Sequence, residues 1–174
     1  MQLGISIDGV GPIVEFNRVG TIWHKLDSNV REIIDKIGKY HPGRLLLEFT
    51  PVLSTYTVLS IPDQIRYAEQ VGIGKQWVKY HNILQSPEIL NLKNLTPEAK
   101  EIIASELEKR KDQYKDLGEC YDRYCIVVNN YLQQDPIYES ARREECENLY
   151  PARFNELVPE LADWWKNIPQ FKES

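Results

Sequence analysis

The first 83 residues alternate short apolar runs with segments of helical periodicity, and this alternation limits the possible folds more than any other feature. Apolar runs at Leu3–Ile7, Arg44–Val52 and Gln76–Ile83 predict strands. The segments 22–40 and 61–71 between them place apolar side chains at helical spacing. Strand, helix and strand in this order predict a parallel sheet with right-handed crossovers. Because the runs are so apolar, we expect the sheet to be covered on both faces.

The remaining segments divide the chain into two parts. Residues 12–20 predict a loop, and Thr96-Pro97-Glu98 predicts the start of a long helical region that breaks near Gly118. A further helix is predicted over Tyr138–Leu149. We therefore expect a strand-and-helix part over 1–95 and a helical extension over 96–174, packed together as one structural unit.

Charge and composition narrow the classes of partner. The 174 residues carry a formal net charge of -5, which gives no general attraction to nucleic acid or to anionic lipid. The chain also lacks a signal peptide and any apolar run long enough to cross a membrane, for which about 20 residues are needed. A cytoplasmic protein that binds neither nucleic acid nor membrane is the resulting prediction.

The cysteines and histidines do not form a recognisable ligand set. Cys120, Cys125 and Cys146 lie in the helical part without the close spacing of common metal motifs, so free and mostly buried thiols are expected. The three histidines are scattered over different predicted elements. No metal site is predicted within this chain.

Candidate binding residues lie where the first predicted strand ends. Side chains alternate along a strand, so Ser6 and Asp8 share one face, where a hydroxyl and a carboxylate suit ribose hydroxyls or an amino group. Asp8-Gly9 is equally typical of an ordinary turn. Arg18 can hold a ligand carboxylate through its two-pronged guanidinium, or it can form an exposed ion pair with Glu15. The residues alone leave both alternatives open.

Longer segments carry a family resemblance. Residues 5–11 (ISIDGVG) and 15–18 (EFNR) resemble the fourth-strand segment of radical S-adenosylmethionine proteins that have a twitch-type C-terminal region. Residues 47–56 and 78–87 resemble that family's fifth and sixth strands, and 96–100 (TPEAK) resembles a helix start that follows them. The resemblance spans nearly the whole chain, and it implies a partial, half β/α barrel of about three parallel strands over 1–95.

The same resemblance implies a ligand and its contacts. It places Ser6 beside the ribose of S-adenosylmethionine and Arg18 at the ligand's carboxylate, with Asp8 and Glu15 next to them. The family's CxxxCxxC loop, which binds a [4Fe-4S] cluster, is missing from this sequence. The chain alone is therefore expected to be inactive, and such a cluster would have to come from a partner chain.

Two functional hypotheses follow. In the first, the chain is a split or truncated half barrel that pairs with a separate N-terminal half-barrel chain to form a radical enzyme. In the second, it is a non-catalytic interaction or regulatory protein that keeps the α/β scaffold and self-associates through its first strand as a homodimer. Both hypotheses predict an unpaired sheet edge at the first strand.

Overall fold

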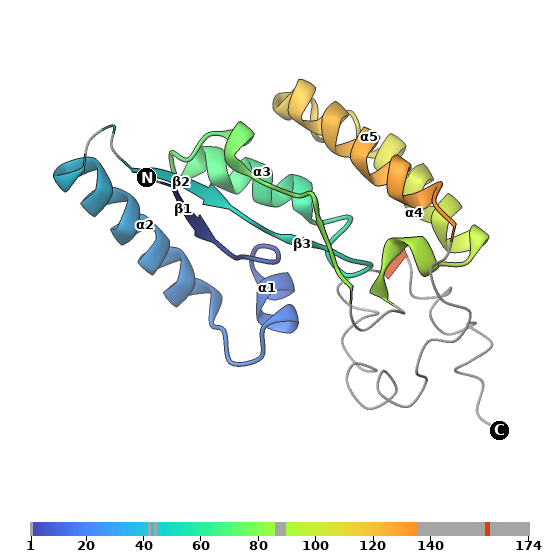
Figure 1. Ribbon diagram of the computed structural model, residues 1–174, viewed down its shortest axis with the longest axis horizontal. Coiled ribbons are helices and arrows are strands. Elements are labelled where there is room, and N and C mark those ends of the chain that lie inside the picture. The colour runs from blue at the N-terminus through green and yellow to red at the C-terminus, as the bar shows by residue number, and fades with distance from the viewer. Residues whose placement is uncertain (1, 42, 44, 86–89, 136–158, 161–174) are drawn as a thin grey trace.

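The computed structural model describes residues 2–41, 43, 45–85, 90–135 and 159–160. This part of the chain is a mixed α/β fold (Figure 1). Its strands are β1 (Gln2–Ile5), β2 (Leu46–Phe49), β3 (Val52–Leu53) and β4 (Asn82–Ile83). Its α-helices are α1 (Pro12–Asn17), α2 (Trp23–Tyr40), α3 (Ile61–Gln70), α4 (Pro97–Lys109) and α5 (Glu119–Leu132). Short 3-10 turns occupy Lys75–Trp77, Leu92–Asn94 and Lys115–Leu117.

The strands form two small parallel sheets, which confirms the predicted parallel pairing. Strand β1 pairs with β2 in the register Leu3 to Leu47, and β3 pairs with β4 in the register Val52 to Asn82. A single bridge from Phe49 to Val78 links the two sheets. Between this bridge and the β3–β4 pair the register shifts by one residue, so the later segment carries one extra residue, as in a β-bulge.

The strands are shorter than the sequence predicts. The predicted strand over Gln76–Ile83 is wrong in its first part, because Lys75–Trp77 forms a 3-10 turn and only β4 is assigned as strand. The predicted strand over Arg44–Val52 is divided into β2 and the start of β3. Three adjacent backbone segments nevertheless run parallel, in the order β1, then β2 and β3, then residues 78–83.

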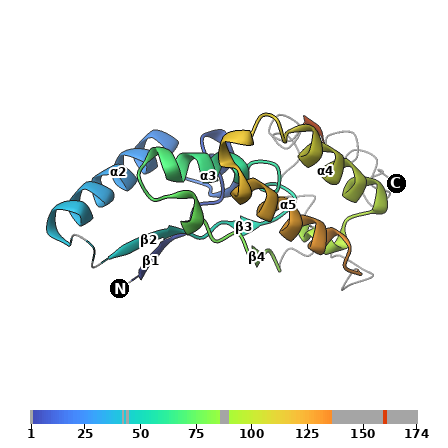
Figure 2. The same cartoon turned by 90° about the horizontal axis from the view of Figure 1, so that it is seen from above.

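One face of the β1–β2 sheet is covered and the other is open, so the expected cover on both faces is wrong for the described residues. Helices α2 and α3 lie on the same side of the strands (Figure 2). Leu47 and Phe49 are buried on that side, with Phe49 stacked on Tyr67 of α3. On the opposite side Leu46 remains 46% exposed.

The helix boundaries largely follow the sequence signals. Helix α2 ends at Tyr40, and α4 begins after Thr96, whose hydroxyl accepts a hydrogen bond from the amide of Ala99. The expected break near Gly118 comes too late, because α4 already ends at Lys109; Gly118, with φ of 55°, separates the following 3-10 turn from α5. The predicted loop over 12–20 is wrong in its first part, where Pro12 opens α1.

The helical part packs directly against the sheet part through tyrosine and arginine side chains. The Tyr124 hydroxyl donates a hydrogen bond to the carbonyl of Val58, and the Tyr114 hydroxyl donates one to Asp63 Oδ1 at 2.9 Å. Arg110 Nη1 also donates to the Leu59 carbonyl at 3.2 Å. The buried apolar residues of the two parts form one continuous core. The predicted helix over 138–149 lies outside the described residues.

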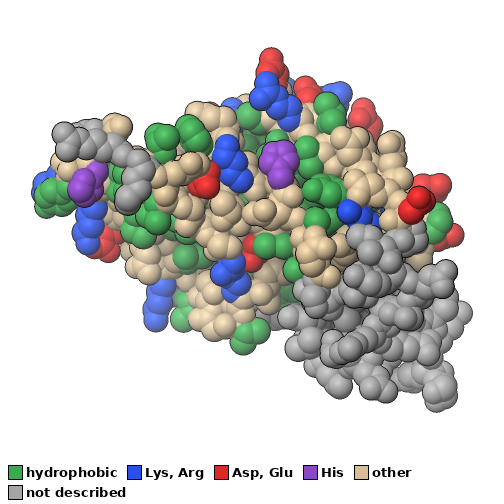
Figure 3. Space-filling view, viewed as in Figure 1, with side chains coloured by type: hydrophobic (Ala, Val, Ile, Leu, Met, Phe, Trp, Pro, Cys, Tyr) green, Lys and Arg blue, Asp and Glu red, His purple; other side chains and the backbone are tan. Residues whose placement is uncertain are grey.

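A closed barrel is not formed by the residues that the structure describes. Within the same residues, no helix is both long and apolar enough to cross a membrane. The surface seen in Figure 3 carries acidic and basic side chains interspersed with apolar ones, without a large area of one sign.

Candidate functional site

Three of the four candidate residues meet just beyond the carboxyl end of β1. Arg18 Nε donates a hydrogen bond to Asp8 Oδ2 at 2.9 Å, and Arg18 Nη2 donates to Ser6 Oγ at 2.6 Å. Ser6 and Asp8 lie within three residues after the end of β1, and Arg18 directly follows α1. The sequence prediction that these side chains lie together is consistent with this geometry. We call Ser6, Asp8 and Arg18 the strand-end triad.

Backbone contacts fix the triad to the neighbouring strand. The second Asp8 oxygen, Oδ1, accepts a hydrogen bond from the Val52 amide at 2.8 Å, and the Asp8 carbonyl accepts one from Asn17 Nδ2 at 2.9 Å. Ser6 Oγ lies 3.4 Å from the Thr50 carbonyl. These bonds hold Asp8 in one orientation, so Asp8 is a pre-organised anchor for the Arg18 guanidinium.

Gln64 of α3 supports the same strand end from the covered side. Its side chain is fully buried, and its Nε2 donates a hydrogen bond to the Ile7 carbonyl at 2.7 Å. Ile7 itself is fully buried between Ser6 and Asp8. Sequence reasoning missed Asn17, Gln64 and Val52, because their roles depend on contacts between distant segments, and a lone amide side chain carries no local signal.

The guanidinium of Arg18 has N–H donors that the triad does not use. Its Nε and one Nη2 hydrogen serve the triad, and the described residues offer no further partner. The outer fork, formed by Nη1 and the other Nη2 hydrogen, can therefore donate two hydrogen bonds to an incoming carboxylate in bidentate geometry. The side chain is 40% exposed, so a ligand can reach it. The carboxylate of Asp8 largely balances the positive charge of Arg18. This balance favours a ligand group that carries a positive and a negative charge over a simple anion.

Glu15 is not part of the strand-end triad, and its carboxylate instead binds the start of α2. Its Oε1 accepts a hydrogen bond of 2.7 Å from the amide of Trp23, the first residue of α2. A carboxylate at this position satisfies an otherwise unpaired helix amide and interacts favourably with the helix dipole. The alternative ion pair between Arg18 and Glu15 is not formed, because Arg18 pairs with Asp8.

The cysteines do not resemble a metal or nucleophile site. Cys120 and Cys125 of α5 are free, partly buried and packed against the core, in agreement with the expected free and mostly buried thiols. Burial raises the pKa of the Cys125 thiol, which disfavours the reactive thiolate. Cys146 lies outside the described residues. Among those described, no group of three or more His, Cys, Asp or Glu side chains is placed to hold a metal ion.

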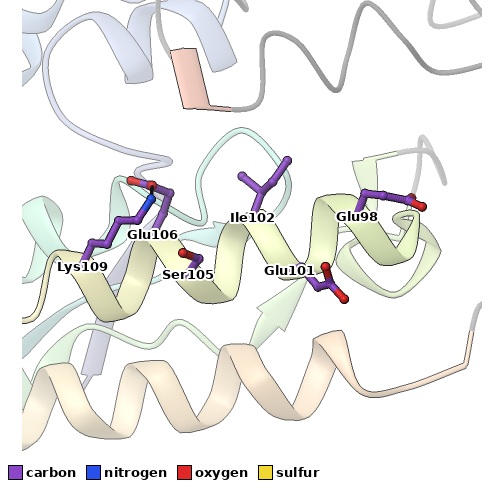
Figure 4. Close-up of a pocket in the computed structure, with 6 residues that line it drawn as sticks. All are labelled: Glu98, Glu101, Ile102, Ser105, Glu106 and Lys109. Carbon is purple, nitrogen blue, oxygen red and sulfur yellow. Dashed lines mark hydrogen bonds and ion pairs between the residues drawn. The ribbon is translucent and has the colours of Figure 1, made fainter.

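A concavity lies on α4, away from the triad. It has a volume of about 350 Å³ and is lined by Glu98, Glu101, Ile102, Ser105, Glu106 and Lys109. Figure 4 shows that all six side chains come from successive turns of this one helix. Lys109 and Glu106 already form an ion pair at 2.7 Å. These side chains do not converge on a common point, so the concavity offers no defined chemistry.

Comparisons of the chain with protein-family models, with curated proteins and with solved structures found no match.

Proposed function

We propose that this chain is the C-terminal half of a radical S-adenosylmethionine-like barrel, which binds S-adenosylmethionine at the strand-end triad. The observation that carries the proposal is the outward fork of Arg18, held at the carboxyl end of a parallel strand and on the open face of the sheet. Ligands of open and closed α/β folds bind beyond the carboxyl ends of parallel strands.

The donor set suits the amino-acid end of this ligand. The free fork of Arg18 matches a carboxylate, and the remaining lone pairs of Asp8 can accept hydrogen bonds from an ammonium group. Ser6, between them and the strand, offers a hydroxyl to a neighbouring ribose. The nearly balanced pair of Arg18 and Asp8 is thus complementary to a zwitterionic α-amino acid group.

The described residues do not fit a [4Fe-4S] cluster. Cys120 and Cys125 lie on α5, and no suitable ligand group surrounds the triad. In this proposal the chain therefore binds and orients the ligand, while any cluster belongs to a second chain. The edge of β1 that faces away from β2 has no strand partner among the described residues, and a strand of that second chain can pair there.

The test is a calorimetric titration of the purified chain with S-adenosylmethionine. Arg18→Ala should weaken binding at least tenfold, since it removes the bidentate contact to the carboxylate, for which about 1.5–3 kcal/mol is typical. Arg18→Lys keeps the charge but not the fork, and we expect intermediate affinity. Equal affinity in all three proteins would refute the proposed site.

The unpaired β1 edge also favours a second candidate, a non-catalytic homodimer. The exposed residues of β1 include no charge or proline, the features that commonly protect edge strands from pairing. Light scattering during size-exclusion chromatography distinguishes the two functions. A concentration-dependent dimer lost on Gly4→Pro, which removes an edge amide, would favour the homodimer, whereas a monomer excludes it.

A further inference from the structure

The open face of the sheet holds a carboxylate that the triad does not use. Glu48 of β2 lies opposite Gly4 of β1 in the parallel register, on the same face as Ser6. In strands, residues two apart share a face, so the Gly4–Glu48 row lies one step, about 7 Å, toward the amino end from Ser6. Glu48 therefore lies on the same open face as the strand-end triad.

The space beside Glu48 is kept open by a glycine. A Cβ atom on Gly4 would lie 3.6 Å from Glu48 Oε1 and 3.5 Å from Thr50 Cγ2, both ordinary contacts. A side chain at this position is therefore sterically acceptable to the fold but would take up space next to the carboxylate. We call Gly4 and Glu48 the strand-centre pair.

The charge of Glu48 is not balanced by a neighbouring cation. Its Oε2 accepts a hydrogen bond from the neutral amide of Gln2, and no described Lys, Arg or His side chain lies within 4.0 Å of its carboxylate. Asp8, by contrast, is paired with Arg18. The strand-centre pair thus offers a half-buried negative charge to a ligand on the open face.

We propose that Glu48 is the counter-charge for the sulfonium of the bound ligand and sets a preference for sulfonium over neutral thioether ligands. This inference rests on the proposed function, because the triad must hold the amino-acid end. The sulfonium of S-adenosylmethionine is a few bonds from its carboxylate. This separation is comparable with the spacing of about 7 Å between alternate residues on one face of a strand. A carboxylate near a cation stabilises it by Coulomb attraction, which a neutral sulfur does not experience.

The experiment compares S-adenosylmethionine with S-adenosylhomocysteine, which has the same groups but a neutral sulfur, by calorimetry on the full chain. We expect the wild-type protein to prefer the sulfonium ligand about tenfold. Glu48→Gln, which is nearly isosteric, should bring the two affinities within about twofold by weakening the sulfonium ligand alone. Glu108→Gln removes an equal charge from the exposed side of α4 and should leave the preference intact.

The possible failures are distinguishable. Arg18-dependent binding with no preference between the two ligands, or with a preference that survives Glu48→Gln, overturns this inference and leaves the proposed function standing. Binding that does not depend on Arg18 overturns both. The melting temperature of Glu48→Gln, followed by circular dichroism, checks that the fold is retained.

Gly4→Ala tests the strand-centre pair without changing its charge. Because the added methyl group fills the space beside Glu48, we expect both ligands to bind several-fold more weakly while their ratio is kept. Unchanged affinity for both ligands would place them away from the strand-centre pair and would overturn the inference.

Discussion

The sheet part and the helical part of this protein differ in how completely their polar groups are hydrogen-bonded and their apolar surfaces are covered. In the helical part, buried tyrosines contact one another, and the hydroxyls of Tyr114, Tyr121 and Tyr124 each donate a hydrogen bond. In the described residues of the sheet part, β1 has a strand on one edge only, and one face is open. The comparison indicates that stability is concentrated in the packing around α3, α4 and α5, whereas the open groups around β1 are available for binding.

The largest expected effect is at Tyr124, which is fully buried where α5 meets the sheet part. Tyr124→Ala should lower the free energy of unfolding by about 3–5 kcal/mol, since it leaves a cavity and an unpaired Val58 carbonyl. Tyr124→Phe removes only the hydrogen bond and should cost about 1 kcal/mol. Urea denaturation measures both. A loss below 1 kcal/mol for the alanine variant would contradict the view that this junction stabilises the molecule.

A matched pair of leucines tests whether one face of the sheet is open. Leu47 is 9% exposed and Leu46 is 46% exposed, although they are adjacent in β2. Leu47→Ala should cost about 2–3 kcal/mol, whereas Leu46→Ala should cost less than about 1 kcal/mol. Thermal or urea denaturation of the monomer gives both values. If the two substitutions cost the same, the second face is covered in solution.

The smallest expected effect concerns pH and the link between α3 and the 3-10 turn before α5. The Arg66 guanidinium donates to both oxygens of Asp116 and lowers the pKa of that carboxyl group. A lowered folded-state pKa gives stability that is present above the ordinary carboxyl value, near pH 4, and that is lost as pH falls through the folded-state pKa. Because Asp116 is about half exposed, this contribution is less than about 1 kcal/mol.

Asp116→Asn should therefore make the stability less dependent on pH between about pH 5 and pH 2, as measured by urea denaturation at each pH. Asp112→Asn is the control, because Asp112 is exposed and has no ion-pair partner among the described residues. An Asp116→Asn variant with the same acid dependence as the wild type would show that this ion pair does not stabilise the junction.

Local sequence signals predicted the elements that local physics determines. The apolar stripe of 22–40 specifies α2, and Thr96 followed by proline specifies the start of α4. Helix α1 was missed because six residues are too few to show a helical period. The shortened third strand was missed because an apolar, aromatic composition does not reveal a 3-10 turn or a one-residue register shift.

The candidate site was predictable only in part, because some of its contacts join segments that are distant in the sequence. Alternation along a strand places Ser6 and Asp8 on one face, and this much follows from the sequence. The choice of Asp8 over Glu15 as the partner of Arg18 depends on how α1 turns the chain back toward β1, which no local pattern encodes. The carboxylate of Glu15 is instead used at the start of α2.

The hydrogen bond between Asp8 Oδ1 and the Val52 amide joins positions 44 residues apart. Closing a loop of that length carries an entropy cost that only cooperative pairing of β1 with β2 can offset. A peptide of residues 1–20 would thus contain every candidate side chain and still lack the site. We expect ligand affinity to appear in one step with the global folding transition, so that refolding followed by ligand binding and by circular dichroism would give the same rate.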